Sequence, residues 1–129
     1  MICAAELRIG NWLFHTGGLG YVQVTGEMIA HIERFPDEKF MTSPPRDILK
    51  PVEITEERLV KCGFEKDWTD YGADCLTKGM FCFMETKYQH ETLWLLEIRG
   101  VAMGYYKHLH QLQNLYYCLT EKELEIKEL

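Results

Sequence analysis

The stretch MFCFMETKYQHETLWLLEI, residues 80–98, decides the fold class, because two apolar runs flank a polar turn within it. Both runs are rich in aromatic and aliphatic residues, which is typical of strands. The segment YGADCLT, residues 71–77, precedes them, and a further turn is expected at Lys78 and Gly79. The region therefore predicts a three-stranded antiparallel meander.

The predicted strands are apolar on both sides. In the second strand the two phenylalanines point one way, while Met80, Cys82 and Met84 point the other way. A sheet with one solvated face would carry polar residues on that face. We therefore expect both faces to be covered, one by a C-terminal helix and the other by the N-terminal region, by a helix at 54–62 or by a second subunit.

ITEERLVKCGF, residues 54–64, predicts a short helix from the residues at its two ends. Thr55 is a good N-cap residue, and Glu56 and Glu57 lie in the first turn, where the helix dipole favours acids. Gly63 fits the position just after the last turn, where a left-handed backbone commonly ends a helix. Local chemistry therefore predicts both ends of this helix.

The first 34 residues predict three short strands, at 12–14, 21–25 and 28–33, separated by a glycine-rich loop and by Gly26. An isolated hairpin is not stable in water, so we expect these strands to close into a small barrel of the SH3 type. Aromatic side chains on such a barrel can stack nucleic-acid bases. The candidates for stacking are Trp12, Phe14 and Tyr21.

Residues 35–51 contain all four prolines and predict a long connection. Long connections of this kind are either mobile or functional. The predicted fold class is therefore α+β, with an SH3-like β-barrel at 1–34 packed against a helix, meander and C-terminal helix at 52–129. We expect the 129 residues to form a single compact unit.

KHLHQLQNLYYCLT, residues 107–120, predicts the C-terminal helix. An apolar stripe suited to covering a sheet recurs at helical spacing along it. The stripe consists of Leu109, Leu112, Tyr116 and Leu119. The two histidines are two residues apart, so they would point roughly 200° apart around a helix and could not bind one metal ion together. We therefore expect no metal site here.

The polar side of this helix leaves a second interpretation open. Tyrosine and amide side chains suit wet protein interfaces, so this side could dock a partner. The candidate partner surface consists of His110, Gln113, Asn114 and Tyr117.

Composition excludes several classes of function. The net charge of −6 disfavours sequence-independent nucleic-acid binding, which depends on positive charge. No apolar run approaches the roughly 20 residues of a membrane span, and none of the five cysteines forms a CxxC pair. We therefore expect a reduced, cytoplasmic protein without membrane contact, cofactor or metal. No catalytic motif is present, so no catalytic residue is assigned.

Three segments together resemble a group of small uncharacterised proteins from Bacteroidales genomes, their prophages and other mobile elements. They are ELRIGNW at 6–12, KPVEITEERLVKCGFEK at 50–66 and HLHQLQNLYYCLTEKEL at 108–124. The resemblance implies a genetic context but no activity and no functional residues. Its relatives tend to have glycine where this chain has Glu121, so the last helix either ends there or continues into the tail.

These observations favour a non-enzymatic binding or adaptor protein of phage or mobile-element origin that acts through protein–protein contacts. Its partner would be another protein or a second copy of the chain. The alternative is a nucleic-acid-binding module that uses the three barrel aromatics, although the acidic charge disfavours nucleic acid as a partner. An enzyme with a site assembled in the 35–51 loop has no positive support from the sequence.

Overall fold

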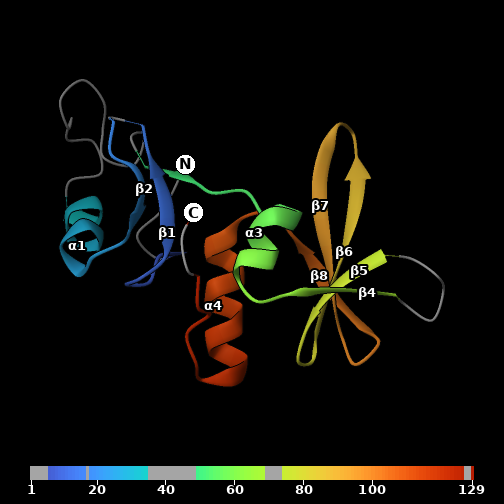
Figure 1. Ribbon diagram of the computed structural model, residues 1–129. Coiled ribbons are helices and arrows are strands. Elements are labelled where there is room, and N and C mark those ends of the chain that lie inside the picture. Colours follow the sequence, from blue (N-terminus) through green and yellow to red (C-terminus); the bar gives the residue numbers. More distant parts are fainter. Residues whose placement is uncertain (1–5, 17, 35–48, 69–73, 127–128) are drawn as a thin grey trace. The chain divides into compact units, whose positions relative to one another are not determined.

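The computed structural model describes residues 6–16, 18–34, 49–68, 74–126 and 129 (Figure 1). The fold is α+β, with two antiparallel sheets. The chain divides into two units, each with its own sheet. Unit 1 contains Met1–Glu53 and His108–Lys122, and unit 2 contains Ile54–Lys107 and Glu123–Leu129. The C-terminal helix thus shares a unit with the N-terminal strands. The predicted single compact unit stays a prediction.

Unit 1 is built on a three-stranded sheet in the order β2-β1-β3. Its strands are β1 (Trp12–His15), β2 (Gly20–Gln23) and β3 (Leu49–Pro51). The first two lie where the sequence predicts them. The third comes from the end of the proline-rich stretch, whose other residues lie outside the described part. Among the described residues these strands form an open sheet and not the predicted closed barrel.

The predicted third strand at 28–33 is wrong, because these residues belong to helix α1 (Gly26–Arg34). The Oγ1 of Thr25 accepts a hydrogen bond from the backbone N–H of Met28 at 3.2 Å, which caps the first turn. Met28 and Ile32 are four residues apart, so on a helix they share one face. That face packs on the sheet. The buried core of unit 1 consists of Leu13, Val24, Ile32 and Leu49.

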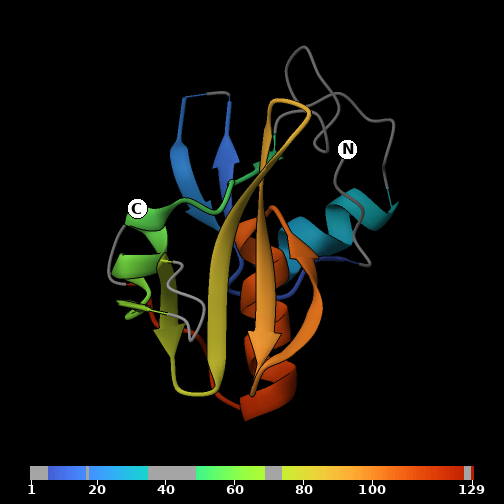
Figure 2. The ribbon, with the colours of Figure 1, turned by 90° about the vertical axis from the view of Figure 1, so that its right-hand side faces the viewer.

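Unit 2 is built on a five-stranded antiparallel meander in the order β4-β5-β6-β7-β8 (Figure 2). The strands are β4 (Glu65–Trp68), β5 (Asp74–Lys78), β6 (Phe81–Tyr88), β7 (Glu91–Ile98) and β8 (Val101–Tyr106). The predicted three-stranded meander is its centre, β5 to β7. The sequence missed both edge strands, because β4 is highly charged and β8 contains a glycine.

The two faces of this sheet differ in burial. The inner face carries Phe81, Phe83, Trp94 and Leu96, all buried, whereas the outer face carries Cys82, Met84, Leu93 and Leu95, all half-buried. The segment around the central helix covers the inner face, since the Phe64 and Phe83 rings meet edge to face at 5.6 Å. The C-terminal helix belongs to unit 1, so its predicted cover of one face of this sheet stays a prediction.

The central helix α3 (Glu56–Lys61) ends as predicted. Gly63 has a φ of +92°, and the backbone N–H of Phe64 reaches back to the carbonyl oxygen of Leu59 at 3.0 Å. This is the hydrogen bond of a Schellman motif, which satisfies a carbonyl at the helix end. At the other end, the Oγ1 of Thr55 accepts a hydrogen bond from the N–H of Arg58 at 3.2 Å.

Replacing Thr55 by alanine removes this cap and leaves an N–H group of the first turn without its partner. We expect Thr55→Ala to lower the free energy of unfolding by about 1 kcal/mol, measured by urea denaturation. Glu57→Ala is the matched control, because Glu57 is an exposed residue in the same turn. This substitution should lower the free energy of unfolding by only about 0.3 kcal/mol. Equal losses for the two variants would contradict the capping role.

Candidate functional site

Helix α4 (Leu109–Thr120) contains the four residues predicted to form a partner surface. They do not share one exposed surface. His110 and Gln113 are only 2% and 3% exposed, Asn114 is half-buried and Tyr117 is exposed. The apolar stripe is also only partly buried, since Leu119 is exposed at the end of the helix. The polar side of α4 therefore lies largely in the interior of the protein.

Two amide side chains of α4, those of Gln113 and Asn114, bind the N-terminal segment. The Oε1 of Gln113 accepts a hydrogen bond from the backbone N–H of Trp12 at 2.9 Å, and its Nε2 donates to the carbonyl oxygen of Gly10 at 3.3 Å. The Oδ1 of Asn114 accepts from the Nδ2 of the fully buried Asn11 at 2.9 Å. These bonds join residues about one hundred positions apart in the sequence.

Arg8 extends this contact along the helix. Its Nε donates to the Oδ1 of Asn114 at 3.2 Å, and its guanidinium carbon lies 4.4 Å from the centre of the Tyr117 ring, a cation–π distance. Gln113, Asn114 and Tyr117 therefore all have partners within the chain. The sequence could not show this, because nothing local to α4 identifies Arg8 or Asn11 as their partners.

His110 sits beside these residues with an unusual environment. Its Nε2 lies 3.4 Å from Glu6 Oε1, and its ring stacks on that of His108 at 5.9 Å. The two rings can meet because His108 is the N-cap residue, with an extended backbone, so the predicted 200° separation does not apply. Burial lowers the pKa of His110, which Glu6 partly offsets. No cluster of three histidine, cysteine or acidic residues in the described ranges could hold a metal ion.

Two of the described cysteine thiols, those of Cys62 and Cys82, are poorly suited to nucleophilic chemistry. Burial raises the pKa of Cys62 to about 11 and that of Cys82 to about 12. Such thiols remain protonated near neutral pH, whereas the thiolate is the nucleophile. The two cysteines therefore offer no activated group.

The outward face of the unit 1 sheet brings two of the predicted stacking residues together. The rings of Phe14 and Tyr21 lie across β1 and β2 at 5.2 Å, in an edge-to-face arrangement, and both are partly exposed. Trp12 lies on the same face of β1 and is half-buried. Lys50 is directly opposite Phe14 on β3. The sequence missed this lysine because it lies in the predicted connection.

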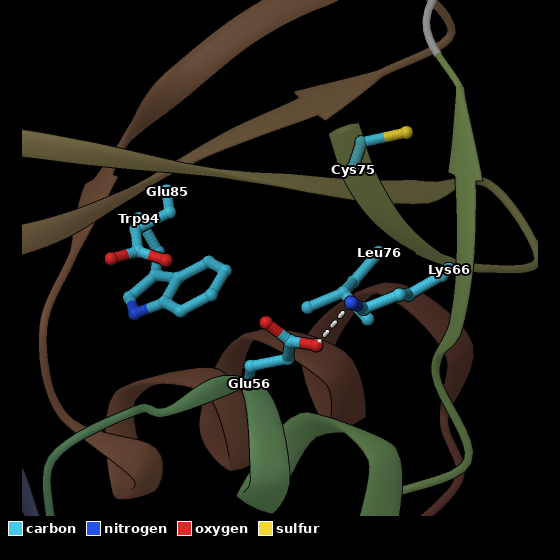
Figure 3. A pocket seen from close by; sticks show the side chains of 6 residues that line it. All are labelled: Glu56, Lys66, Cys75, Leu76, Glu85 and Trp94. Carbon is cyan, nitrogen blue, oxygen red and sulfur yellow. Dashed lines mark ion pairs between the residues drawn. The ribbon is translucent and has the colours of Figure 1, made fainter. Parts of the chain in front are cut away.

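Unit 2 contains a cavity of about 110 Å³ on the inner side of its sheet. Two acidic residues and one lysine surround an apolar floor (Figure 3). The lining residues are Glu56, Lys66, Cys75, Leu76, Glu85 and Trp94. The Lys66 ammonium lies 2.7 Å from the Glu56 carboxylate, and the indole N–H of Trp94 donates to the carbonyl oxygen of Ile54 at 3.0 Å.

The two edges of the five-stranded sheet contrast sharply. The edge strand β4 carries Glu65, Lys66 and Asp67 in sequence, and charges of this kind protect an edge from pairing with another chain. The edge strand β8, VAMGYY, has neither a charge nor a proline. Its three large side chains at alternate positions, Val101, Met103 and Tyr105, are 61%, 50% and 58% exposed.

A shift in register lies between β7 and β8. Leu96 is opposite Gly104 and Glu97 is opposite Ala102, so Met103 has no partner residue on β7. This is the pattern of a β-bulge, which increases the local twist of a strand. Met103 is thereby displaced from the ladder.

Searches with this chain found no matching family model, no similar curated protein and no similar solved structure. None of the helices in the described ranges is both long and apolar enough to cross a membrane. Three features of the described residues could bind a partner or ligand. They are the edge strand β8, the aromatic face of the unit 1 sheet and the cavity in unit 2.

The lowered pKa of His110 makes the stability of unit 1 depend on pH. The unfolded chain protonates this residue near its ordinary pKa of 6.5, above the pKa in the folded protein. The contribution of neutral His110 to the free energy of unfolding is therefore complete above pH 6.5. We expect it to be lost as the pH falls from 6.5 towards the pKa of His110 in the folded protein. The measurement is the free energy of unfolding between pH 7.5 and 5.0 for the wild type and for His110→Gln.

The difference between the two curves isolates His110 from the carboxylates that titrate in the same range. His90→Gln, in the exposed β6–β7 turn, is the control and should follow the wild type. If His110→Gln lost stability on acidification as steeply as the wild type, burial of this imidazole would not be the cause.

Proposed function

We propose that the chain is a non-enzymatic binding protein that acts through protein–protein contacts, and that the edge strand β8 is its contact surface. The observation that supports this most strongly is the uncharged, apolar and exposed sequence of β8 at the edge of the sheet. An edge strand presents a row of backbone N–H and C=O groups that an extended peptide can pair with.

Side chains add to this backbone recognition. Exposed aromatic and methionine side chains are enriched at the centres of protein interfaces, and Met103 and Tyr105 are of this kind. The bulge at Met103 interrupts the regular ladder between β7 and β8, and the strand continues to Tyr106. β8 therefore combines a short pairing edge with two large apolar contacts.

The charges that flank β8 favour a foreign partner over a second copy. Arg99 lies just before the strand, and Lys107, whose ammonium is 3.2 Å from the Glu91 carboxylate, lies just after it. In a two-fold antiparallel pairing of β8 with itself, Arg99 of one copy would approach Lys107 of the other, and facing like charges are unfavourable. We therefore assign the occupant as an extended segment of another protein, apolar at its centre and acidic at its ends.

A phage or mobile-element origin remains part of the proposal and rests on the resemblance of the three segments. We also propose a cytoplasmic location, since the described cysteines Cys62, Cys75, Cys82 and Cys118 are free thiols, which reducing compartments preserve.

The surface is tested with random 12-residue peptides displayed on phage and selected on the full chain. We expect the selected peptides to carry acidic ends and to slow hydrogen exchange of β8 amides. Tyr105→Lys should weaken their binding by roughly tenfold or more, because burying a charged side chain in the contact is costly.

Tyr88→Lys is the matched control, because Tyr88 is equally exposed, at 60%, but lies at the tip of the β6–β7 hairpin. It should leave peptide binding unchanged. Peptides that bind Tyr105→Lys as well as the wild type, or that protect only amides outside β8, would contradict the proposal. Concentration-dependent dimerisation through β8 would show that the occupant is a second copy instead.

A second candidate function is single-stranded nucleic-acid binding by the outward face of the unit 1 sheet. The observation that favours it is the row of Tyr21, Phe14 and Lys50 across three neighbouring strands. Aromatic rings stack on bases and a lysine binds phosphate, which is the combination used by sheets that bind single strands. The acidic net charge makes this the weaker candidate.

Phe14→Ala should weaken binding of a fluorescein-labelled 12-nucleotide oligo(dT) by roughly five- to a hundredfold, since stacking contributes about 1–3 kcal/mol per base. The measurement is fluorescence anisotropy at low salt. Leu19→Ala, at an exposed apolar residue in the β1–β2 loop, is the control and should have no effect. Absence of any binding by the wild type would exclude this candidate.

A further inference from the structure

The cavity in unit 2 has an apolar floor with its polar atoms already satisfied. Leu76 and Trp94 are both buried, and the indole N–H of Trp94 is used by the carbonyl oxygen of Ile54. The indole therefore offers only its ring to anything in the cavity. In the view of Figure 3 this ring lies between the carboxylates of Glu85 and Glu56.

The rim of the cavity is acidic. Two carboxylates line it against one ammonium group, that of Lys66, so the lining has a net charge of −1. Glu85 is opposite Trp94 on the neighbouring strand, and the Lys87 ammonium, which lies 2.8 Å from its carboxylate, is not part of the lining. The ion pairs at the rim are exposed, so they exchange partners at little cost.

The size of the cavity limits the ligand. A dry protein cavity of about 150 Å³ holds benzene, so a volume of about 110 Å³ takes about five non-hydrogen atoms. The pocket is open on one side, so this limit applies to the part of a ligand that enters it. An aromatic ring attracts a cation over its face, and carboxylates bind an ammonium by charge-assisted hydrogen bonds.

From these observations we infer that the cavity binds a primary ammonium group carried on a short alkyl stem. The stem lies against Leu76, and the ammonium group lies over the Trp94 ring, beside the carboxylates of the rim. Such a group is present both in small amines and in the lysine side chain of a partner protein. The site is on the inner side of the sheet and does not depend on the edge strand β8.

The test is a titration of the full ¹⁵N-labelled chain with n-butylammonium, at constant ionic strength, followed through the indole N–H signal of Trp94. A Trp94→Phe variant assigns this signal among the three tryptophans. We expect a saturable shift with a dissociation constant on the order of millimolar, as befits so small a ligand. n-Butanol, the neutral analogue, and butyrate, the anion, should produce no saturable shift.

Variants of the rim show whether charge is responsible. Glu85→Gln should weaken n-butylammonium binding roughly two- to fivefold, whereas Glu57→Gln, next to Glu56 but outside the lining, should not change it. The spectra themselves report whether each variant is folded. A comparison with Nα-acetyl-lysine-methylamide distinguishes the sources, because tighter binding of this compound indicates a lysine side chain and tighter binding of n-butylammonium indicates a free amine.

Three results would overturn the inference. The first is no shift of the Trp94 indole N–H signal when the n-butylammonium concentration is 100 times the expected dissociation constant. The second is an equal shift with n-butanol, which would mean that the cavity recognises only apolar shape. The third is unchanged binding by Glu85→Gln, which would mean that the acidic rim plays no part.

Discussion

The side-chain amides of Gln113 and Asn114 determine how the rest of the chain is organised. Gln113 is buried, and a buried amide without hydrogen-bond partners destabilises a fold by several kcal/mol. Its partners are the backbone of Gly10 and Trp12, while Asn114 takes the side chain of Asn11. The last helix therefore belongs with the first strands. Polar residues that could have formed a docking surface are used instead to hold unit 1 together.

The exposed apolar edge strand and the cavity both belong to unit 2. There the sheet has one edge that is charged and one edge that is apolar, and proteins do not usually leave an apolar edge strand exposed without a use for it. The inner face of the same sheet holds a cavity with an aromatic floor and an acidic rim. The proposed partner of the edge would contact backbone and apolar side chains, whereas the proposed ligand of the cavity carries a single charge, so the two sites are chemically distinct.

Features fixed by local chemistry could be predicted from the sequence. The caps of α3 at Thr55 and Gly63 are interactions within a few residues, and both are present. The hairpin between β6 and β7 was predicted from the two apolar runs that flank a polar turn, and in the structure Gln89 and His90 of this turn both have positive φ. Helix α4 ends at Thr120, and Glu121 adopts the left-handed conformation that glycine usually supplies.

Features that depend on distant residues could not be predicted. Six residues at 28–33 are too few to separate helical from strand periodicity, and only the cap by Thr25 and packing on the sheet decide for α1. Gly104 obscured β8, because a glycine within a strand marks a bulge that only the pairing with β7 reveals. The candidate sites were missed for the same reason, since Glu56, Glu85 and Trp94 come from three separate elements.

The most direct test of this organisation is hydrogen exchange of the Trp12 backbone amide in wild type and in Gln113→Leu. Leucine removes the acceptor for this amide while keeping similar bulk. The predicted result is exchange at least about fivefold faster at Trp12, since an unmet buried hydrogen bond costs about 1–3 kcal/mol. The amide of Leu96, in unit 2, should keep its rate. Unchanged exchange at Trp12 would contradict the account, because the helix would then be held in unit 1 by something other than its amides.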